Sequence, residues 1–272
     1  MSQWSPRVRT FRALHDAGCF VMPNPWDAGS ARLLAGLGFP ALATTSAGMA
    51  WAMGRRDNDV GVGDVLAHLR TIAAAADVPV NADFEGGFAV APPEVAANVA
   101  RAAATGVAGL SIEDSTGDPA EPLFAFDLAV ERVRAARAAL DASGTGVLLT
   151  GRSEGFIAGR PDLAETIRRL VAYAEAGAEC LYAPGIRTPE EIGAVVRAVA
   201  PRPVNVLAHT DFATVAELAA LGVRRISVGG ALARAAWGGF MTAAREIAAQ
   251  GTFSALARGM PSAELNDAFR RR

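Results

Sequence analysis

The sequence predicts a (β/α)8 barrel with an extra N-terminal helix and a C-terminal helical tail. Eight short apolar segments recur along the 272 residues and alternate with stretches of helical periodicity, and no linker or low-complexity tract divides the chain. Short buried strands that alternate with helices are typical of parallel α/β folds. An open doubly wound sheet is the alternative, although no GxGxxG motif follows the first apolar segment. We expect residues 1–272 to form a single barrel domain.

Residues 1–18 are expected to form the N-terminal helix, because Trp4, Val8, Phe11 and Leu14 follow helical spacing. Four of the segments predicted as strands carry a glycine that ends a helix-like stretch, a position where glycine accepts a positive φ without steric cost. The eight strands are predicted within residues 19–24, 36–44, 77–84, 104–112, 144–152, 175–183, 201–209 and 220–228.

Helices are predicted between these strands, and several begin with Pro, Thr or Asp and carry acidic residues in the first turn, as helix N-termini prefer. The clearest are residues 92–106, 126–140, 163–177 and 188–200. Residues 250–272 are expected to form a helical tail. Its apolar side chains need a surface to cover them, so we expect a homo-oligomer, either a dimer or a tetramer. These side chains are Phe253, Leu256, Met260, Leu265 and Phe269.

Composition excludes several classes of function. A formal net charge of -2 and a pI near 6.0 provide no basic surface for nucleic acid. No apolar segment approaches the roughly 20 residues that cross a bilayer, which predicts a cytoplasmic protein without a membrane partner. Cys19 and Cys180 open apolar runs and are predicted to be buried free thiols rather than a disulfide or a nucleophile. The chain contains no lysine, which excludes Schiff-base chemistry.

Polar side chains gather where the predicted strands end, which is the end that forms the active site of (β/α)8 barrels. Asn81, Asp83 and Glu85 occupy alternate positions at the end of the third strand and therefore face the same side. The other candidates are Thr45, Ser46 and Asp57 after the second strand, Glu113 and Asp114 after the fourth, Arg152 and Glu154 after the fifth, and Asn205 and His209 on the seventh.

If Asp57, Asp83, Glu85 and Glu113 converge at one barrel mouth, their repulsion must be compensated, and Arg152 alone cannot balance them. Oxygen ligands with few histidines available favour a hard ion, and Mg2+ is the natural candidate. In the competing interpretation, Asp83 caps the following loop and Glu85 is solvated.

A family resemblance follows from five motifs that occur in register. They are TTSAGMAWAMGRRDND, VNADFEGGF, GLSIEDS, LLTGRSEGFIAG, and the region from GAECLYAPG to PVNVLAHTDF. In this order the chain resembles the isocitrate lyase / phosphoenolpyruvate mutase superfamily, over roughly residues 10–250. The resemblance implies a (β/α)8 barrel, usually a tetramer with the last barrel helix swapped between subunits. It also implies a bound Mg2+, with Mn2+ as a substitute, and a 2-oxo acid substrate whose C–C or P–C bond is broken through an enolate.

The resemblance assigns roles to individual residues. It implies that Asp83 and Glu113 belong to the metal shell and that Asp57 is a further acid of the site, with Asp57, Glu113 and Arg152 catalytic. Arg152 matches an arginine that binds a substrate carboxylate, for which its planar fork is suited; a structural ion pair with Glu154 or Glu113 is the alternative. The turn formed by Thr45, Ser46 and Ala47 is expected to bind substrate, together with Asn205 and His209, although His209 also fits a hydrogen-bonded rim residue.

Two departures from the superfamily pattern limit the function. The usual Asp-Ala-Asp is Asn81-Ala82-Asp83, so an amide replaces one acid and Glu85 is the residue that could restore the charge. The loop after the fourth strand, TGDPAEPLFAFDLAVERV, contains no Cys, Lys or His. Isocitrate and methylisocitrate lyases carry a lysine- and cysteine-containing motif there. The resemblance therefore disfavours those two activities and a standard phosphoenolpyruvate mutase.

The predicted function is a Mg2+-dependent carbon–carbon lyase acting on a small 2-oxo or 2-hydroxy carboxylic acid, by cleavage or decarboxylation of an oxaloacetate-like acid. A catalytically weakened 2-oxo acid binding protein and a P–C bond-cleaving, phosphonomutase-type enzyme are the alternatives. A phosphate-handling barrel is a third hypothesis, because Gly229 and Gly230 follow the eighth strand, where barrels bind phosphate. Tight turn geometry explains the two glycines equally well.

Overall fold

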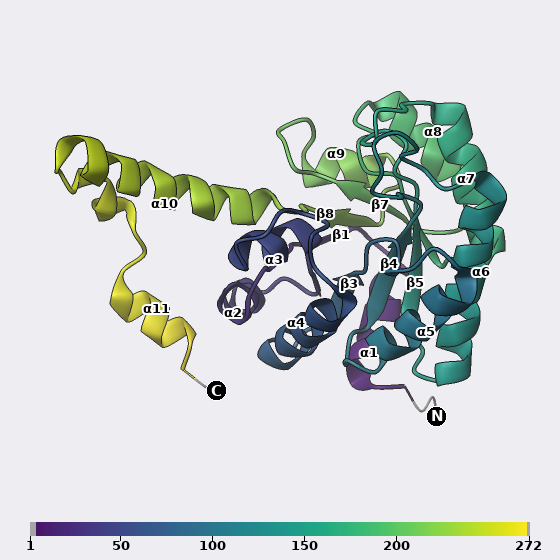
Figure 1. Cartoon of the computed structure of the whole chain (residues 1–272), viewed down its shortest axis with the longest axis horizontal. Coiled ribbons are helices and arrows are strands. Elements are labelled where there is room, and N and C mark those ends of the chain that lie inside the picture. Colours follow the sequence, from purple (N-terminus) through teal and green to yellow (C-terminus); the bar gives the residue numbers. More distant parts are fainter. Residues whose placement is uncertain (1–3, 271–272) are drawn as a thin grey trace.

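Eight parallel strands form a nearly closed barrel in the computed structural model, which describes residues 4–270 (Figure 1). The strands are β1 (Phe20–Met22), β2 (Leu42–Ala43), β3 (Val80–Asp83), β4 (Gly109–Glu113), β5 (Leu148–Arg152), β6 (Cys180–Tyr182), β7 (Val204–Leu207) and β8 (Arg225–Ser227). They pair in the order β1-β8-β7-β6-β5-β4-β3-β2. A hydrogen bond of 3.0 Å from the Ala43 N–H to the Pro23 carbonyl joins β2 to the segment after β1. The predicted barrel is thus confirmed, and each strand lies within its predicted segment except β4, which ends one residue beyond its segment, at Glu113.

Helices connect the strands and cover the outside of the barrel (Figure 1). Local signals in the sequence set their ends: Thr188 and Thr214 form capping boxes with Glu191 and Glu217. The helices are α1 (Pro6–Leu14), α2 (Ala28–Gly36), α3 (Ser46–Ala52), α4 (Val62–Ala75), α5 (Pro92–Ala103), α6 (Phe126–Ser143), α7 (Leu163–Glu175), α8 (Pro189–Val199), α9 (Val215–Ala220), α10 (Ala231–Gln250) and α11 (Ser262–Ala268), with a 3-10 helix η1 (Ser254–Arg258).

The N-terminal helix α1 packs against the barrel core through buried Val8 and Phe11. Of the predicted range 1–18, residues 1–3 lie outside the described part of the chain, and the helix spans Pro6–Leu14. A Cβ atom on Gly109 of β4 would lie 2.5 Å from the Phe11 ring and 2.7 Å from Asn81 Oδ1. Glycine at this position therefore permits the close approach of α1 to the barrel interior.

The C-terminal segment differs from the rest of the molecule because α10 extends away from the barrel (Figure 1). Of the twenty residues of α10, Ala233 is buried. Large apolar side chains along α10 and the following tail are exposed, namely Leu232, Trp237, Phe240, Met241, Ile247, Phe253, Leu256 and Met260. The predicted tail, residues 250–272, contains η1 and α11, with residues 271–272 outside the described range.

No helix within residues 4–270 is both long enough and apolar enough to traverse a membrane. Both cysteines are free thiols; Cys180 is buried and Cys19 is half-buried.

Candidate active site

A cavity of about 140 Å3 opens at the C-terminal ends of the strands. The barrel topology explains its lining, because parallel strands deliver their last residues to one rim. Seven of the predicted site residues line it: Ser46, Ala47, Asp57, Asn81, Asp83, Arg152 and Asn205. They come from four different strand ends, and their convergence was not visible in any single sequence segment.

Arg152 lies at the centre of the charged groups. Its Nη1 atom is 3.2 Å from Asp83 Oδ1 and 3.1 Å from Glu113 Oε2. Its Nε and Nη2 atoms donate to the two carboxylate oxygens of Glu154. The guanidinium also lies over the Tyr182 ring, 5.2 Å from its centroid. Each of the two interpretations of Arg152 therefore has support. The residue lines the cavity, as a substrate-binding arginine would, and it is ion-paired to three acids, as a structural arginine would be.

Asp83 is held from two sides. Its backbone N–H donates to Thr44 Oγ1 at 2.9 Å, and its Oδ2 atom accepts the Ser46 N–H at 3.0 Å. The remaining oxygen, Oδ1, pairs with Arg152. Because the Ser46 N–H binds one carboxylate oxygen and the Thr44 hydroxyl holds the Asp83 backbone, the orientation of Asp83 toward the cavity does not depend on Arg152 alone.

Burial changes the acid–base properties of the other carboxyls. The pKa of Glu113 is raised well above its ordinary value by burial, against the pull of Arg152, and Glu154 adds repulsion. Burial also raises the pKa of Glu154, with Arg152 opposing the shift. Burial lowers the pKa of Arg152, but Glu113 and Glu154 outweigh it, so that the pKa lies well above its usual range. The site therefore holds more negative charge than its arginine can neutralise.

Asp57 and Glu85 add to this negative charge from the rim. Asp57 is exposed to solvent, yet protein atoms cover its cavity side, and that burial together with Asp83 raises its pKa while Ser46 lowers it. Burial, then Asp83 and Asp57, raise the pKa of Glu85 to about 8. Asp57, Asp83 and Glu85 are thus close enough to interact electrostatically, as the sequence predicted.

The loop that carries Glu85 has a strained backbone, because Glu85 and Phe88 adopt positive φ angles of 45° and 57°. Arg132 of α6 holds this loop. Its guanidinium donates to the carbonyls of Gly86, Ala89 and Val90, the last at 2.8 Å, and is 1% exposed. It also lies 3.9 Å from the centroid of the Phe124 ring, on the loop after β4. Arg132 thereby connects the loops that follow β3 and β4.

The raised pKa of Glu85 predicts a dependence of stability on pH. Because the folded pKa of about 8 exceeds the ordinary value of 4.5, the folded state binds more protons than the unfolded chain between these limits. The free energy of unfolding should therefore fall as pH rises from about 4.5 to about 8. Urea unfolding in EDTA at pH 5, 6.5 and 8 should show a smaller fall for Glu85→Gln than for the wild type. Glu94→Gln, in the first turn of α5, is the control, and equal pH slopes for both variants would contradict the prediction.

The remaining predicted substrate residues occupy different environments. Thr45 is buried, and its Oγ1 atom caps α3 by accepting the Gly48 N–H at 3.3 Å. Asn205 lines the cavity and is fixed by Ser227. His209 lies away from the cavity lining; its Nε2 atom is 3.1 Å from the Arg187 guanidinium, and its pKa is lowered by burial and by Arg187.

The glycine turn after β8 is already engaged by the protein. The N–H groups of Val228 and Gly229 both donate to Asn24 Oδ1, each at 2.9 Å. Gly229 has a φ of 54°, which glycine adopts without strain. The turn therefore has a structural role, and the phosphate-handling hypothesis loses the donors on which it depended.

Sequence reasoning overlooked two residues that line the cavity, Tyr182 and Arg225. Tyr182 lies at the end of β6 beneath Arg152, and burial raises its pKa to about 12. Arg225 begins β8, and alternation along that strand was the signal that could have placed its side chain inside the barrel. Tyr182 lies within the quoted motif GAECLYAPG but was not singled out there, and Arg225 lies outside the five motifs; the barrel geometry brings both to the cavity.

The acids do not form a ready-made metal cage. Within residues 4–270, no group of three or more His, Cys, Asp or Glu side chains is arranged to hold a metal ion. Arg152 lies between Asp83 and Glu113 instead. The Oδ1 atom of Asn81 is buried and has no hydrogen-bond partner among the described residues. Of the predicted metal ligands, Asn81, Asp83 and Asp57 line the cavity, whereas Glu85 and Glu113 do not. Asn81 Oδ1 is the oxygen of this group that is buried without a partner in the described part of the chain.

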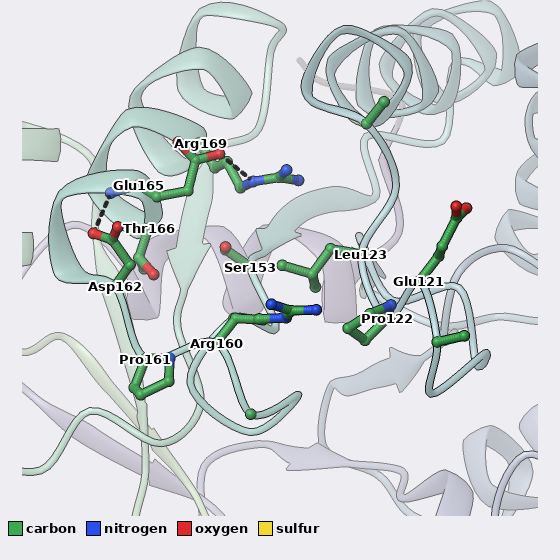
Figure 2. A pocket seen from close by; sticks show the side chains of 14 residues that line it. Glu121, Pro122, Leu123, Ser153, Arg160, Pro161, Asp162, Glu165, Thr166 and Arg169 are labelled. Atoms are coloured by element: carbon green, nitrogen blue, oxygen red, sulfur yellow. Dashed lines mark hydrogen bonds and ion pairs between the residues drawn. The ribbon is translucent and has the colours of Figure 1, made fainter.

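A larger cavity, about 770 Å3, lies between the loop after β4 and the segment after β5 (Figure 2). Pro122 and Leu123 form one side, and Arg160 and Thr166 lie opposite (Figure 2). Its lining contains none of the predicted site residues. It meets the site only at Ser153, which stands between Arg152 and Glu154 in the chain. We assign the chemistry to the smaller cavity because the titratable groups converge there.

The fold and the acidic barrel mouth define an enzyme of the (β/α)8 lyase and mutase class. Residues 11–248 match the family model described as phosphoenolpyruvate phosphomutase. The chain therefore belongs to that family, within the phosphoenolpyruvate mutase / isocitrate lyase superfamily, as its motifs indicated.

Individual relatives agree with this assignment. The chain is 29% identical over 205 residues to an oxaloacetate decarboxylase of Rhodopseudomonas palustris, covering 72% of this chain and 68% of the relative. It is 30% identical to the 2-methylisocitrate lyase of Escherichia coli over 195 residues, covering 68% and 64% of the two chains. A crystal structure of oxaloacetate acetylhydrolase with its product oxalate superimposes with a TM-score of 0.85 at 26% identity, covering 96% and 93%.

Proposed function

We propose that this protein is a Mg2+-dependent carbon–carbon lyase that cleaves or decarboxylates a small, oxaloacetate-like 2-oxo acid. The observation that carries the proposal is the group of acids around Arg152 at the C-terminal mouth of the barrel. The names of the relatives, oxaloacetate decarboxylase and 2-methylisocitrate lyase, support C–C chemistry. The loop after β4 contains no Cys, Lys or His, which favours a reaction that needs no side chain of these types from that loop.

The donor set fits a hard divalent cation. Asp83 and Glu113 would hold the ion, with the buried amide oxygen of Asn81 and the carboxylate of Glu85 as further oxygen donors. The raised pKa values of Glu113 and Glu85 support this assignment, because burial and, after it, the neighbouring acids disfavour their charged forms, and a cation would stabilise those forms. When bound, Mg2+ would supply polarisation of the 2-oxo group and stabilise the negative charge that develops on its oxygen.

The residues of the chain supply orientation. The N–H of Ser46 and the hydroxyl of Thr44 hold the Asp83 segment at the mouth. Arg152 pairs with both Asp83 and Glu113 and so holds Glu113 beside the acid that lines the cavity. Because these side chains are already held in place, less reorganisation of the site is needed during the reaction.

An assay of pyruvate and carbon dioxide release from oxaloacetate tests the proposal. Turnover above the rate with metal alone should require Mg2+, stop with EDTA and return with added Mg2+. Asp83→Asn should lower kcat/KM at least about 100-fold, because it removes a fixed charge from the site. Asp77→Asn is the matched control, since Asp77 is fully exposed and precedes β3 at the opposite rim. Undiminished turnover in EDTA would refute the proposal.

Assays on the same purified protein distinguish the two alternative functions. The family model's description, phosphoenolpyruvate phosphomutase, keeps the P–C bond-cleaving hypothesis open. Asn81 in place of an acid motivates a 2-oxo acid binding protein with weakened catalysis. Release of inorganic phosphate from phosphonopyruvate, or its rearrangement to a phosphate ester, would establish the former. Tight 2-oxo acid binding without turnover across a broad panel would establish the latter.

We also propose that the protein assembles as a dimer or tetramer through α10. The helix extends from the barrel and exposes an apolar face that includes an edge-to-face pair of Trp237 and Phe240, with ring centroids 5.7 Å apart. Exposed apolar surface of this extent is typical of protein–protein interfaces. The swapped last helix implied by the resemblance would cover it.

Phe240→Asp should therefore shift the molecular mass measured by light scattering toward the monomer. A buried unpaired charge at such an interface costs several kcal/mol, which corresponds to about 100-fold or more in association. Leu37→Asp is the matched control, because Leu37 is an exposed apolar residue at the end of α2. A monomeric wild type, or an unchanged mass for Phe240→Asp, would count against the proposed assembly.

A further inference from the structure

Arg225 is a buried cation whose hydrogen bonds all go to neutral groups. It is 1% exposed and contributes to the lining of the cavity at the barrel mouth. Its Nε atom donates to Asn205 Oδ1 at 2.9 Å, and its Nη2 atom donates to Thr150 Oγ1 at 3.0 Å. Its Nη1 atom is 3.3 Å from His15 Nε2. Among residues 4–270, no carboxylate forms an ion pair with Arg225.

His15 does not alter this charge balance. Burial and the neighbouring Arg225 lower the pKa of His15 to about 3, so its ring is neutral at physiological pH. Its Nδ1 atom lies 2.7 Å from the Phe11 carbonyl and donates to it, which leaves Nε2 as the acceptor for Arg225. The guanidinium therefore keeps its full positive charge in a buried position. Such a charge is costly unless an anion compensates it.

The two arginines of the cavity are consequently not equivalent. The N–H groups of Arg152 are engaged by Glu154, Asp83 and Glu113. It has little capacity left for a two-point contact with a ligand carboxylate unless one of these acids moves away. Arg225 has guanidinium N–H groups beyond the three that are engaged, and no acid competes for them. The cavity thus has acids on one wall and an uncompensated cation on another.

We propose that Arg225 is the anion anchor of the site and binds a carboxylate of the ligand. Thr150, Asn205 and His15 position its guanidinium. The proposal rests on the proposed function, and it narrows the substrate to dicarboxylic acids. One end of the ligand faces Asp83, and its second carboxylate pairs with Arg225. A cavity of about 140 Å3 is well below the roughly 300–1,000 Å3 of sites for drug-sized ligands, which limits the substrate to a short chain.

The test compares two ligands of equal chain length that do not react, malate and 2-hydroxybutanoate, by calorimetry in Mg2+ and in EDTA. The wild type should bind malate at least about 10-fold more tightly than 2-hydroxybutanoate in Mg2+. Arg225→Met should reduce this ratio to near one, whereas Arg225→Lys should keep part of it, because an ammonium retains the charge but not the planar fork. Arg224→Met is the matched control, since Arg224 bonds the Gly18 carbonyl outside the cavity.

The outcomes separate this proposal from the proposed function. Equal or undetectable binding of both ligands by the wild type overturns the anchor, whether or not the variants fold. A preference for malate that survives in folded Arg225→Met, with an unchanged melting temperature and circular dichroism, also overturns it. A preference for malate that depends on Arg225 supports the anchor with or without Mg2+, because the two ligands differ only at the end that pairs with Arg225. Malate binding of equal strength in Mg2+ and in EDTA would count against the metal-dependent function and leave the anchor intact.

Discussion

Replacement of Arg152 with methionine is expected to abolish measurable turnover and to destabilise the protein. The substitution leaves Asp83, Glu113 and Glu154 facing one another without their common cation. Removing one partner of a buried ion pair typically costs about 3–5 kcal/mol. Loss of a charge that fixes reacting groups lowers kcat by about 100-fold to 1,000-fold. Urea unfolding and the oxaloacetate assay measure the two effects.

The pH dependence of this variant is a separate check on the cause. Burial raises the pKa values of Glu113 and Glu154, so lowering the pH protonates these two acids and reduces the repulsion; the loss of stability should therefore be smaller at pH 5 than at pH 7.5. Arg168→Met is the matched control, because Arg168 is an exposed arginine paired with Glu165 on α7. A stability within about 1 kcal/mol of the wild type at pH 7.5 would contradict the central role of Arg152.

Asp114→Ala is expected to have the next largest effect, although Asp114 does not face the cavity. The side chain is buried and accepts three hydrogen bonds: from the Tyr173 hydroxyl at 2.6 Å, from Arg169 Nη1 at 3.1 Å, and from the Glu154 N–H at 2.8 Å. Alanine would leave the Tyr173 hydroxyl and the Glu154 N–H without their acceptor and would remove one of the two carboxylates paired with Arg169, which keeps Glu165, at a cost of about 3–5 kcal/mol.

The same change should lower activity, because the Glu154 N–H anchors the segment that carries Arg152. Asp118→Ala is the matched control, since Asp118 is an exposed acid in the loop after β4. We expect Asp118→Ala to lie within about 0.5 kcal/mol of the wild type in urea unfolding. Equal stabilities for the two variants would show that the buried network of Asp114 contributes little.

Much of the fold could be predicted because its signals are local. The apolar segment at 77–84 contains β3, and the periodic stretch at 163–177 contains α7 with its Asp162 cap. The barrel followed from the alternation of such elements, because parallel strands with helical crossovers have few ways to bury both faces. The extended course of α10 did not follow from periodicity, since its apolar face resembles that of a helix packed on its own barrel; only the family resemblance, with its swapped last helix, indicated it.

Candidate site residues could be predicted from the sequence, but their interactions with one another could not. Motif order sufficed to identify Asp57, Asp83, Glu113 and Arg152 as candidates, because residues at strand ends of a barrel share one rim. The sequence could not reveal that Arg152 pairs with three acids at once, because such pairing depends on side-chain directions.

The sequence by itself determined the class of fold, the family, and the acidic character of the barrel mouth. The tertiary structure alone decided which charges neutralise one another. Arg152 and Arg225 are both arginines on barrel strands, yet one is surrounded by carboxylates and the other by an amide, a hydroxyl and a neutral imidazole. Coulomb interactions depend on distances of a few ångströms between residues far apart in the chain, and only the folded barrel sets those distances.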